Sequence, residues 1–124
     1  MSTRCCIKVI QKLGKKKAEV MLYHHHDGYP EGVGADLVNR SKDFGKAEGK
    51  WFIDDVVNSL VKDINDEYEV TSYNHIDIEY LYTIDCNKMS IKCNECEWIF
   101  EDENGNLVNE NVVGKEVQIP GDGE

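Results

Sequence analysis

The chain has 124 residues, of which 40% are hydrophobic and 31% charged, and its formal net charge at pH 7 is −10. This composition fits one globular domain with a modest core and excludes a chain that is disordered by composition. An acidic surface repels phosphate backbones and anionic lipids, so we expect no non-specific nucleic-acid binding and no membrane attachment. The same charge favours basic protein partners. We interpret the one basic cluster, Lys15–Lys17 with Lys12 nearby, as a solvated hairpin tip.

Cysteine usage suggests a reducing compartment. The cysteines are Cys5, Cys6, Cys86, Cys93 and Cys96. Their number is odd, and no apolar segment resembles a secretory signal or is long enough to cross a membrane. We therefore expect free thiols in a cytoplasmic protein rather than a disulfide framework.

Hydrophobic periodicity predicts two strands, two helices and three further strands. Alternating apolar side chains mark the strands, with Gly14 in the first turn and Asn94-Glu95 in the last. Proline suits the first position of a helix, so the first helix should follow Tyr29-Pro30; the second carries an apolar stripe that includes Leu60 and Ile64. The expected strands are 4–10, 18–25, 75–86, 89–93 and 96–100, and the expected helices are 32–44 and 51–66.

This ββ-αα-βββ order predicts an α+β fold, a two-layer sandwich in which two helices cover one face of a mainly antiparallel sheet. Residues 75–86 alternate cleanly and should form one long half-buried strand. We assign residues 1–110 to a single domain and residues 111–124 to an acidic, partly flexible tail, in which Val112 to Ile119 add at most a short strand.

The most distinctive segment, residues 24–34, reads His-His-His-Asp-Gly-Tyr-Pro-Glu-Gly-Val-Gly. Imidazoles and a carboxylate at a strand end, followed by the amides of a helix start, suit a ligand or a partner. Neighbouring side chains on a strand alternate, so only His24 and His26 face the same way. The candidate ligand- or partner-binding residues are Arg4, His24, His25, His26, Asp27, Gly28, Tyr29, Gly32 and Gly34.

Three interpretations of this segment stay open. In the one we favour, one histidine is packed and one exposed, and Asp27 binds turn amides. Zinc binding and general acid–base catalysis are the alternatives. Because the spacing matches no zinc pattern, we assign no catalytic residue, metal ion or cofactor.

Other chemistry-bearing patterns are incomplete. Cys93-x-x-Cys96 supplies only half of a four-ligand zinc site, and we expect both cysteines to share a core face with Ile91 and Trp98. The many carboxylate pairs fit a solvated face. The chain contains neither a Gly-x-Ser-x-Gly elbow nor a dinucleotide-binding glycine pattern in its usual context.

Two motifs in the first 40 residues resemble those of a group of small proteins from phages, prophages and other mobile elements. They are Met1-Ser2-Thr3-Arg4 and His25-x-Asp27-Gly28-Tyr29-Pro30-x-Gly32-Val33-Gly34. Members of the group commonly begin Met-Gly-Thr-Arg and contain His-Trp-Asp-Gly-Tyr-Pro, so Ser2 and His26 depart from the pattern. The resemblance implies a context rather than a mechanism. At the matching positions, an Arg4–Asp27 ion pair would pin the turn and orient His25.

The sequence favours a binding protein over an enzyme. The leading hypothesis is a small acidic accessory protein of a phage or mobile element that binds a host or phage protein, with host-defence components among the candidate targets. The alternatives are a metal- or histidine-dependent enzyme for a phosphate-containing small molecule, centred on His24–Asp27, and a binder of a nucleotide signal.

Overall fold

The structure, a computed structural model, describes residues 3–45 and 49–121. Its elements in chain order are β1 (Cys5–Leu13), β2 (Lys16–His24), η1 (Pro30–Gly34), α1 (Ala35–Ser41), α2 (Ile53–Val61), η2 (Ile64–Asp66), β3 (Glu69–Thr71), β4 (Tyr80–Asp85), β5 (Ser90–Glu101) and β6 (Leu107–Val117). The first two residues of the phage-like motif and the last three of the expected tail lie outside the described residues, as do residues 46–48 of the loop between the helices.

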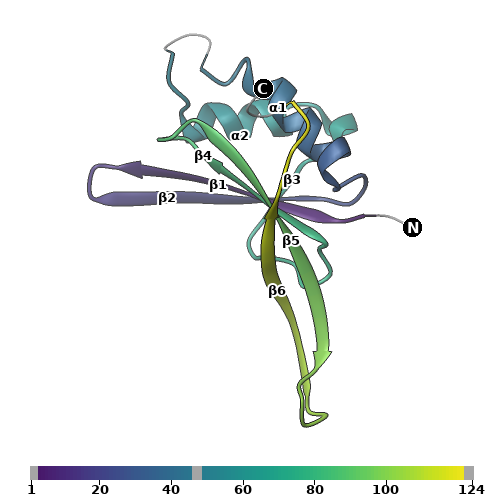
Figure 1. Cartoon of the computed structure of the whole chain (residues 1–124). Helices are drawn as coiled ribbons and strands as arrows, with labels where there is room; N and C mark the ends of the chain where they lie inside the picture. The colour runs from purple at the N-terminus through teal and green to yellow at the C-terminus, as the bar shows by residue number, and fades with distance from the viewer. Residues whose placement is uncertain (1–2, 46–48, 122–124) are drawn as a thin grey trace.

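The six strands form one mixed sheet in the order β3-β2-β1-β4-β5-β6. Every neighbouring pair is antiparallel except β1 and β4, which are parallel. Because β2 is antiparallel to β1, it ends where β4 begins, and the connection between these two strands carries both α-helices. Figure 1 shows α1 and α2 on the same side of the sheet. The expected α+β class with two helices is confirmed, and the sheet is mixed.

The main core lies between the sheet and the helices. Alternation along β1 directs Cys5, Ile7 and Val9 to the helix side, where they pack in one cluster with Leu37 of α1 and Leu60 of α2. All five side chains are fully buried. A smaller cluster on the other face contains Cys6, Ile78 and Leu81.

Helix α2 is shorter than the expected helix over 51–66. Its start is held by the buried Gln11, whose Oε1 accepts the Ile53 amide at 2.9 Å and whose Nε2 donates to the Trp51 carbonyl at 3.2 Å. After Val61 the chain enters η2, in which Asp63 Oδ1 accepts the amide of Asn65 at 2.9 Å. The side-chain cap competes with helix continuation. Ile64 therefore leaves the expected apolar stripe and is 88% exposed.

The first helical segment also differs from its expected range of 32–44. It begins at Pro30 as the π-helical turn η1 and continues as α1 only to Ser41. Val33 and Leu37 face the core from it, while Phe44 is buried in the turn that follows.

The expected long strand over 75–86 is wrong in its first half, because regular pairing begins only at Tyr80. Ile78 packs in the cluster away from the helices, whereas Tyr82 and Ile84 belong to the main core. The Asn111 side-chain amide donates to the carbonyls of Ile76 and Ile78 at 3.0 and 2.9 Å. These bonds hold residues 76–78 outside the ladder, a long-range effect that alternation in the sequence cannot reveal.

The expected turn at Asn94-Glu95 is also wrong, because β5 runs through it without interruption. Asn94 instead donates from Nδ2 to the Gly114 carbonyl of β6 at 3.1 Å. The chain reverses at residues 102–106, and β6 continues through residue 110, the limit assigned to the domain. β6 is longer than the short strand that the sequence suggested.

Replacing Leu60 with alanine tests the position of the core. Because the side chain is fully buried between α2 and the sheet, the change should lower the free energy of unfolding by about 2–5 kcal/mol. Ile64→Ala is the matched control and should change it by less than about 0.5 kcal/mol. Chemical denaturation measures both, and equal losses would contradict the ending of α2 at Val61.

Candidate functional site

A cleft of about 520 Å³ lies where β2 ends, bounded by η1, α1 and the η2–β3 segment. Four of the expected site residues line it: His24, His26, Asp27 and Gly32. Val33, a further residue of the motif, also lines it. The other lining residues are Asp36, Arg40, Asn65, Asp66, Glu67 and Tyr68, which were not among the expected site residues.

The turn that forms one wall of the cleft depends on the backbone of Asp27. This residue has a φ of 54°, and its carbonyl accepts the Val33 amide at 2.8 Å. A Cβ on Gly32 would lie 2.2 Å from that carbonyl oxygen. Glycine is therefore required at position 32 by close backbone approach, which explains part of the motif without a ligand.

The other two motif glycines are fixed by packing against the sheet. The Gly28 amide donates to the Thr3 carbonyl, and a Cβ there would lie 2.9 Å from both that oxygen and Cys5 Cβ. A Cβ on Gly34 would lie 3.2 Å from the ring of Tyr82. The buried Tyr82 hydroxyl donates to the Gly28 carbonyl at 2.7 Å, so one tyrosine of β4 holds both ends of the turn.

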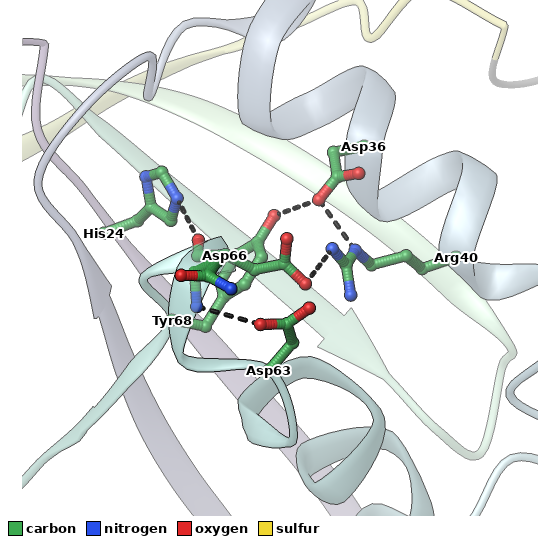
Figure 2. A network of polar contacts seen from close by, with 7 residues as sticks. His24, Asp36, Arg40, Asp63, Asp66 and Tyr68 are labelled. Atoms are coloured by element: carbon green, nitrogen blue, oxygen red, sulfur yellow. Dashed lines mark hydrogen bonds and ion pairs between the residues drawn. The ribbon is translucent and has the colours of Figure 1, made fainter.

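Across the cleft, two carboxylates, an arginine and a tyrosine form a polar network (Figure 2). The Tyr68 hydroxyl donates to Asp36 Oδ2 at 2.7 Å, and Arg40 Nε donates to the same oxygen at 2.8 Å. Arg40 also pairs through its terminal nitrogen with Asp66 Oδ2 at 2.7 Å. The network ties α1 to the η2–β3 segment, two parts of the chain that no strand pairing connects.

The pKa shifts in the network follow from burial and charge. Burial raises the pKa of Tyr68, and the hydrogen bond to Asp36 raises it further. For Arg40, partial burial lowers the pKa, but the hydrogen bonds to Asp66 and Asp36 outweigh burial, and the net shift is upward. Both side chains therefore stay protonated, as hydrogen-bond donors.

His24 joins the network to the turn. Its Nδ1 lies 2.5 Å from the His26 carbonyl and its Nε2 lies 2.8 Å from the Asp66 carbonyl, while its ring packs against Tyr68 with centroids 4.7 Å apart. A carbonyl oxygen only accepts, so the ring nitrogen that carries the proton donates to the carbonyl that it faces. His24 thus acts as a clamp between two loops.

The remaining expected residues lie away from the cleft. Arg4 Nε pairs with Asp77 Oδ2 at 3.3 Å, so the expected Arg4–Asp27 pair is wrong. Asp27 Oδ1 instead accepts from the Tyr29 hydroxyl at 3.2 Å, and the charge of this carboxylate, followed by the hydrogen bond, raises the pKa of the exposed Tyr29. His25 Nδ1 lies 3.2 Å from the Tyr23 hydroxyl in a neighbouring hollow.

These contacts define what the cleft can do chemically. Asp36, Arg40, Asp66, Tyr68 and His24 each hydrogen-bond to one another or to backbone, an arrangement typical of a network that rigidifies a fold. Sequence reasoning missed Asp36 and Arg40 although their i,i+4 spacing on a helix was a visible signal. Asp66 and Tyr68 lie in and just after a short turn and carried no such signal.

The expected free thiols are confirmed, since all five cysteines are unpaired. Cys93 and Cys96 do not share a face as expected: Cys93 lies in the main core, and Cys96 packs against the smaller cluster on the other side. Burial raises the pKa of Cys86, Cys93 and Cys96 to about 11 each. Within residues 3–45 and 49–121, no three or more histidine, cysteine or acidic side chains converge as a metal site would require.

Comparison of the chain with protein-family profiles, with curated proteins and with solved structures finds no match. In the part of the chain that the structure describes, no helix has the length and apolar character needed to span a membrane.

Tyr68→Phe tests the network, because it removes one hydrogen bond to a charged acceptor and keeps the ring. The free energy of unfolding should fall by about 1–3 kcal/mol in chemical denaturation. Tyr73→Phe is the control, because this tyrosine is 60% exposed, and it should lower the free energy of unfolding by less than about 0.5 kcal/mol. A harmless Tyr68→Phe would show that α1 and η2 are held by packing alone.

The thiols give the fold a defined alkaline sensitivity. Because the folded pKa of about 11 lies above the ordinary value of 9.0, the unfolded chain ionises first as pH rises. The thiol contribution to stability should be complete below about pH 9 and be lost between about pH 9 and 11, as measured by denaturation across that range.

Alkylation provides an independent measurement of the same thiols. All five should react in denaturant without a reducing agent, and the buried ones should react far more slowly in the native protein. Fewer than five reactive groups in denaturant would contradict the assignment of free thiols.

Proposed function

We propose that this protein acts by binding a basic protein partner through the β5–β6 hairpin. β4 pairs with β5 only as far as Glu95, and the Cys96 amide donates to the Glu79 carbonyl at 2.8 Å; beyond Cys96, β5 pairs with β6 alone. We call residues 96–113 the hairpin arm. Figure 1 shows β5 and β6 extending away from the body of the sheet and the helices.

The single observation that carries the proposal is the concentration of exposed apolar side chains on this arm. They are Trp98, Phe100, Leu107, Val108, Val112 and Val113. Trp98 and Phe100 lie together with ring centroids 4.5 Å apart, and they are 39% and 55% exposed. Exposed aromatic pairs are the usual anchors of protein interfaces, since they bury a large area at low entropic cost.

The charge of the arm specifies the partner's chemistry. Residues 96–113 contain five carboxylates and neither lysine nor arginine. The five are Glu97, Glu101, Asp102, Glu103 and Glu110. Exposed apolar side chains and carboxylates on the same arm are complementary to a partner surface that combines apolar groups with lysines or arginines. It is not complementary to a nucleic acid or an anionic lipid surface.

The tip of the arm is ordered by Asp102, so the rings are presented on a defined support. Asp102 Oδ1 accepts the amides of Asn104 and Asn106 at 2.9 and 2.8 Å. The hydrogen bonds, led by the one from Asn106, lower the pKa of Asp102. Pre-ordering reduces the entropic cost of binding.

Two register shifts interrupt the regular pairing of β5 with β6, which is the edge strand of the sheet. They fall between Asn94 and Cys96 and between Ile99 and Glu101. Bulges increase local twist and make an edge strand a poor template for another strand. We therefore propose recognition by side chains of the arm rather than by strand addition.

The resemblance of the first 40 residues to phage and mobile-element proteins supplies the biological setting of this proposal. The partner is then a host or phage protein, and components of host defence are the first class to test. A cytoplasmic location stays a prediction.

A synthetic peptide of alternating lysine and leucine tests the arm by isothermal titration calorimetry. Trp98→Ser with Phe100→Ser should weaken binding by about tenfold or more. The matched control, Ile64→Ser with Tyr73→Ser, removes two exposed apolar side chains elsewhere and should leave the affinity unchanged.

A second pair of variants tests the charge. Glu97→Gln with Glu101→Gln should reduce the salt dependence of peptide binding more than Asp54→Asn with Asp55→Asn, which removes two carboxylates from the first turn of α2. Equal effects of the charge variant and its control would show that the peptide responds to net charge. Equal effects within either pair would contradict the proposal that the arm binds the peptide.

A further inference from the structure

A second hollow, of about 620 Å³, lies on the face of the sheet that the helices leave uncovered. The side chains of Lys8, Ile10 and Asp85 alternate away from the core residues Ile7, Val9 and Ile84 and so point to this face. The remaining lining residues are Gln11, Lys12, Lys17, Ala18, Glu19, Asn87 and Lys88. Four of the chain's 14 basic residues therefore surround one depression in a protein whose net charge is −10.

None of these four lysines has a carboxylate within ion-pair distance among the described residues, although the chain has 24 acidic residues. Lys12 and Lys17 stand directly opposite each other on β1 and β2. Like charges at opposite positions of a strand pair destabilise the sheet. The arrangement is unfavourable in the free protein and is relieved by an anion between the ammonium groups.

The rim of the hollow is fixed rather than mobile. Asn87 Oδ1 accepts the Lys12 amide at 2.6 Å, and its Nδ2 donates to the Lys12 carbonyl at 3.1 Å. Asp85 Oδ1 accepts the amides of Asn87 and Lys88 at 3.1 and 3.2 Å. The turn between β4 and β5 is thereby clamped beside the β1–β2 hairpin. The Asp85 carboxylate is engaged by that turn, so it offsets the lysines less.

We propose that this hollow binds a small, multiply charged phosphate compound. Its volume lies in the range of small-molecule sites, and its four ammonium groups outnumber the two carboxylates that also line it, those of Glu19 and Asp85, so the hollow favours an anion. Ile10 adds apolar surface, which suits a phosphate compound with an organic portion. This site is separate from the arm and goes beyond the proposed function, because it would bind a small anion and not a protein.

Inorganic tripolyphosphate and ATP are the probes, each titrated into the full chain at low ionic strength by calorimetry. Both should bind, and backbone NMR shifts should concentrate on β1, β2 and the β4–β5 turn. Tighter binding of ATP would mark a nucleotide-type ligand, and equal binding would mark recognition of phosphate alone. No shift at millimolar tripolyphosphate would overturn the proposal, as would tighter binding of polyglutamate, which would identify an acidic protein as the ligand.

The test variant is Lys12→Gln with Lys17→Gln, and the control is Lys42→Gln with Lys62→Gln. Both lower the charge by two, but the control lysines follow α1 and α2 in the helix layer. The test variant should weaken tripolyphosphate binding by about tenfold, and the control should leave it unchanged. Equal losses of affinity in the two variants would contradict the proposal of a defined site.

Thermal unfolding separates a binding role from a structural one. Without ligand, the test variant should melt at the same temperature as the wild type or higher, because opposed like charges are removed. With tripolyphosphate, the wild type should gain stability and the variant should gain little. A melting temperature that falls in the variant without ligand would overturn the proposal, since the lysines would then support the fold. The arm variant Trp98→Ser with Phe100→Ser should keep full phosphate binding, so this site and the arm can fail independently.

Discussion

The parallel pairing of β1 with β4 is the constraint on which the rest of the structure depends. Cys5 lies beside Tyr80 and Ile10 beside Asp85, so β4 starts and runs level with β1. β2 ends at His24 and β4 begins at Tyr80, both beside Cys5, so the connection between them leaves and re-enters the sheet at the same end, and it folds over one face. The crossover carries both helices, covers that face, and leaves the opposite face to residues 76–78 and the lysine-lined hollow. The arm follows from the short length of β4, because the β4–β5 pairing stops at Glu95 and β5 continues to Glu101.

Much of this fold is contained in local patterns of the sequence. The hairpin of β1 and β2, the apolar stripe of α2 and the alternation over residues 80–85 each depend on near neighbours, and each lies where periodicity placed it. Two of the failures share one cause. Asn111 draws residues 76–78 out of the sheet, and Asn94 binds Gly114 where its own dipeptide suggested a turn. In both cases an amide side chain contacts a distant part of the chain, which no window of adjacent residues contains.

The candidate site also has a part that local sequence features predicted and a part set by long-range contacts. The motif from His24 to Gly34 located a real cleft, because a strand end followed by a glycine-rich helix start is a local feature. The glycines themselves proved to be explained by the Asp27 carbonyl and by Tyr82, the latter some 50 residues away in sequence. Arg4 was expected to pair with Asp27 because the two residues flank neighbouring strands of the first hairpin. Arg4 forms its ion pair with Asp77 instead, on the distant 76–78 segment. Four of the eleven residues that line the cleft, Asn65 to Tyr68, come from η2 and the start of the next segment, whose approach is set by packing of the chain between β2 and β4.

Net charge is a poor guide to what this protein binds, because its charges are segregated. The arm contributes five negative charges in 18 residues, and the hollow on the uncovered sheet face is surrounded by four lysines. Surface charges farther apart than a Debye length of about 8–10 Å are largely screened at physiological ionic strength. Each surface therefore presents its own sign to a partner at contact range, while the total of −10 acts mainly on approach. The global field would guide the proposed basic partner toward the arm and would oppose the entry of anions. A phosphate compound consequently needs the close grouping of Lys8, Lys12, Lys17 and Lys88, which only the pairing of β1 with β2 and the clamp by Asn87 bring together.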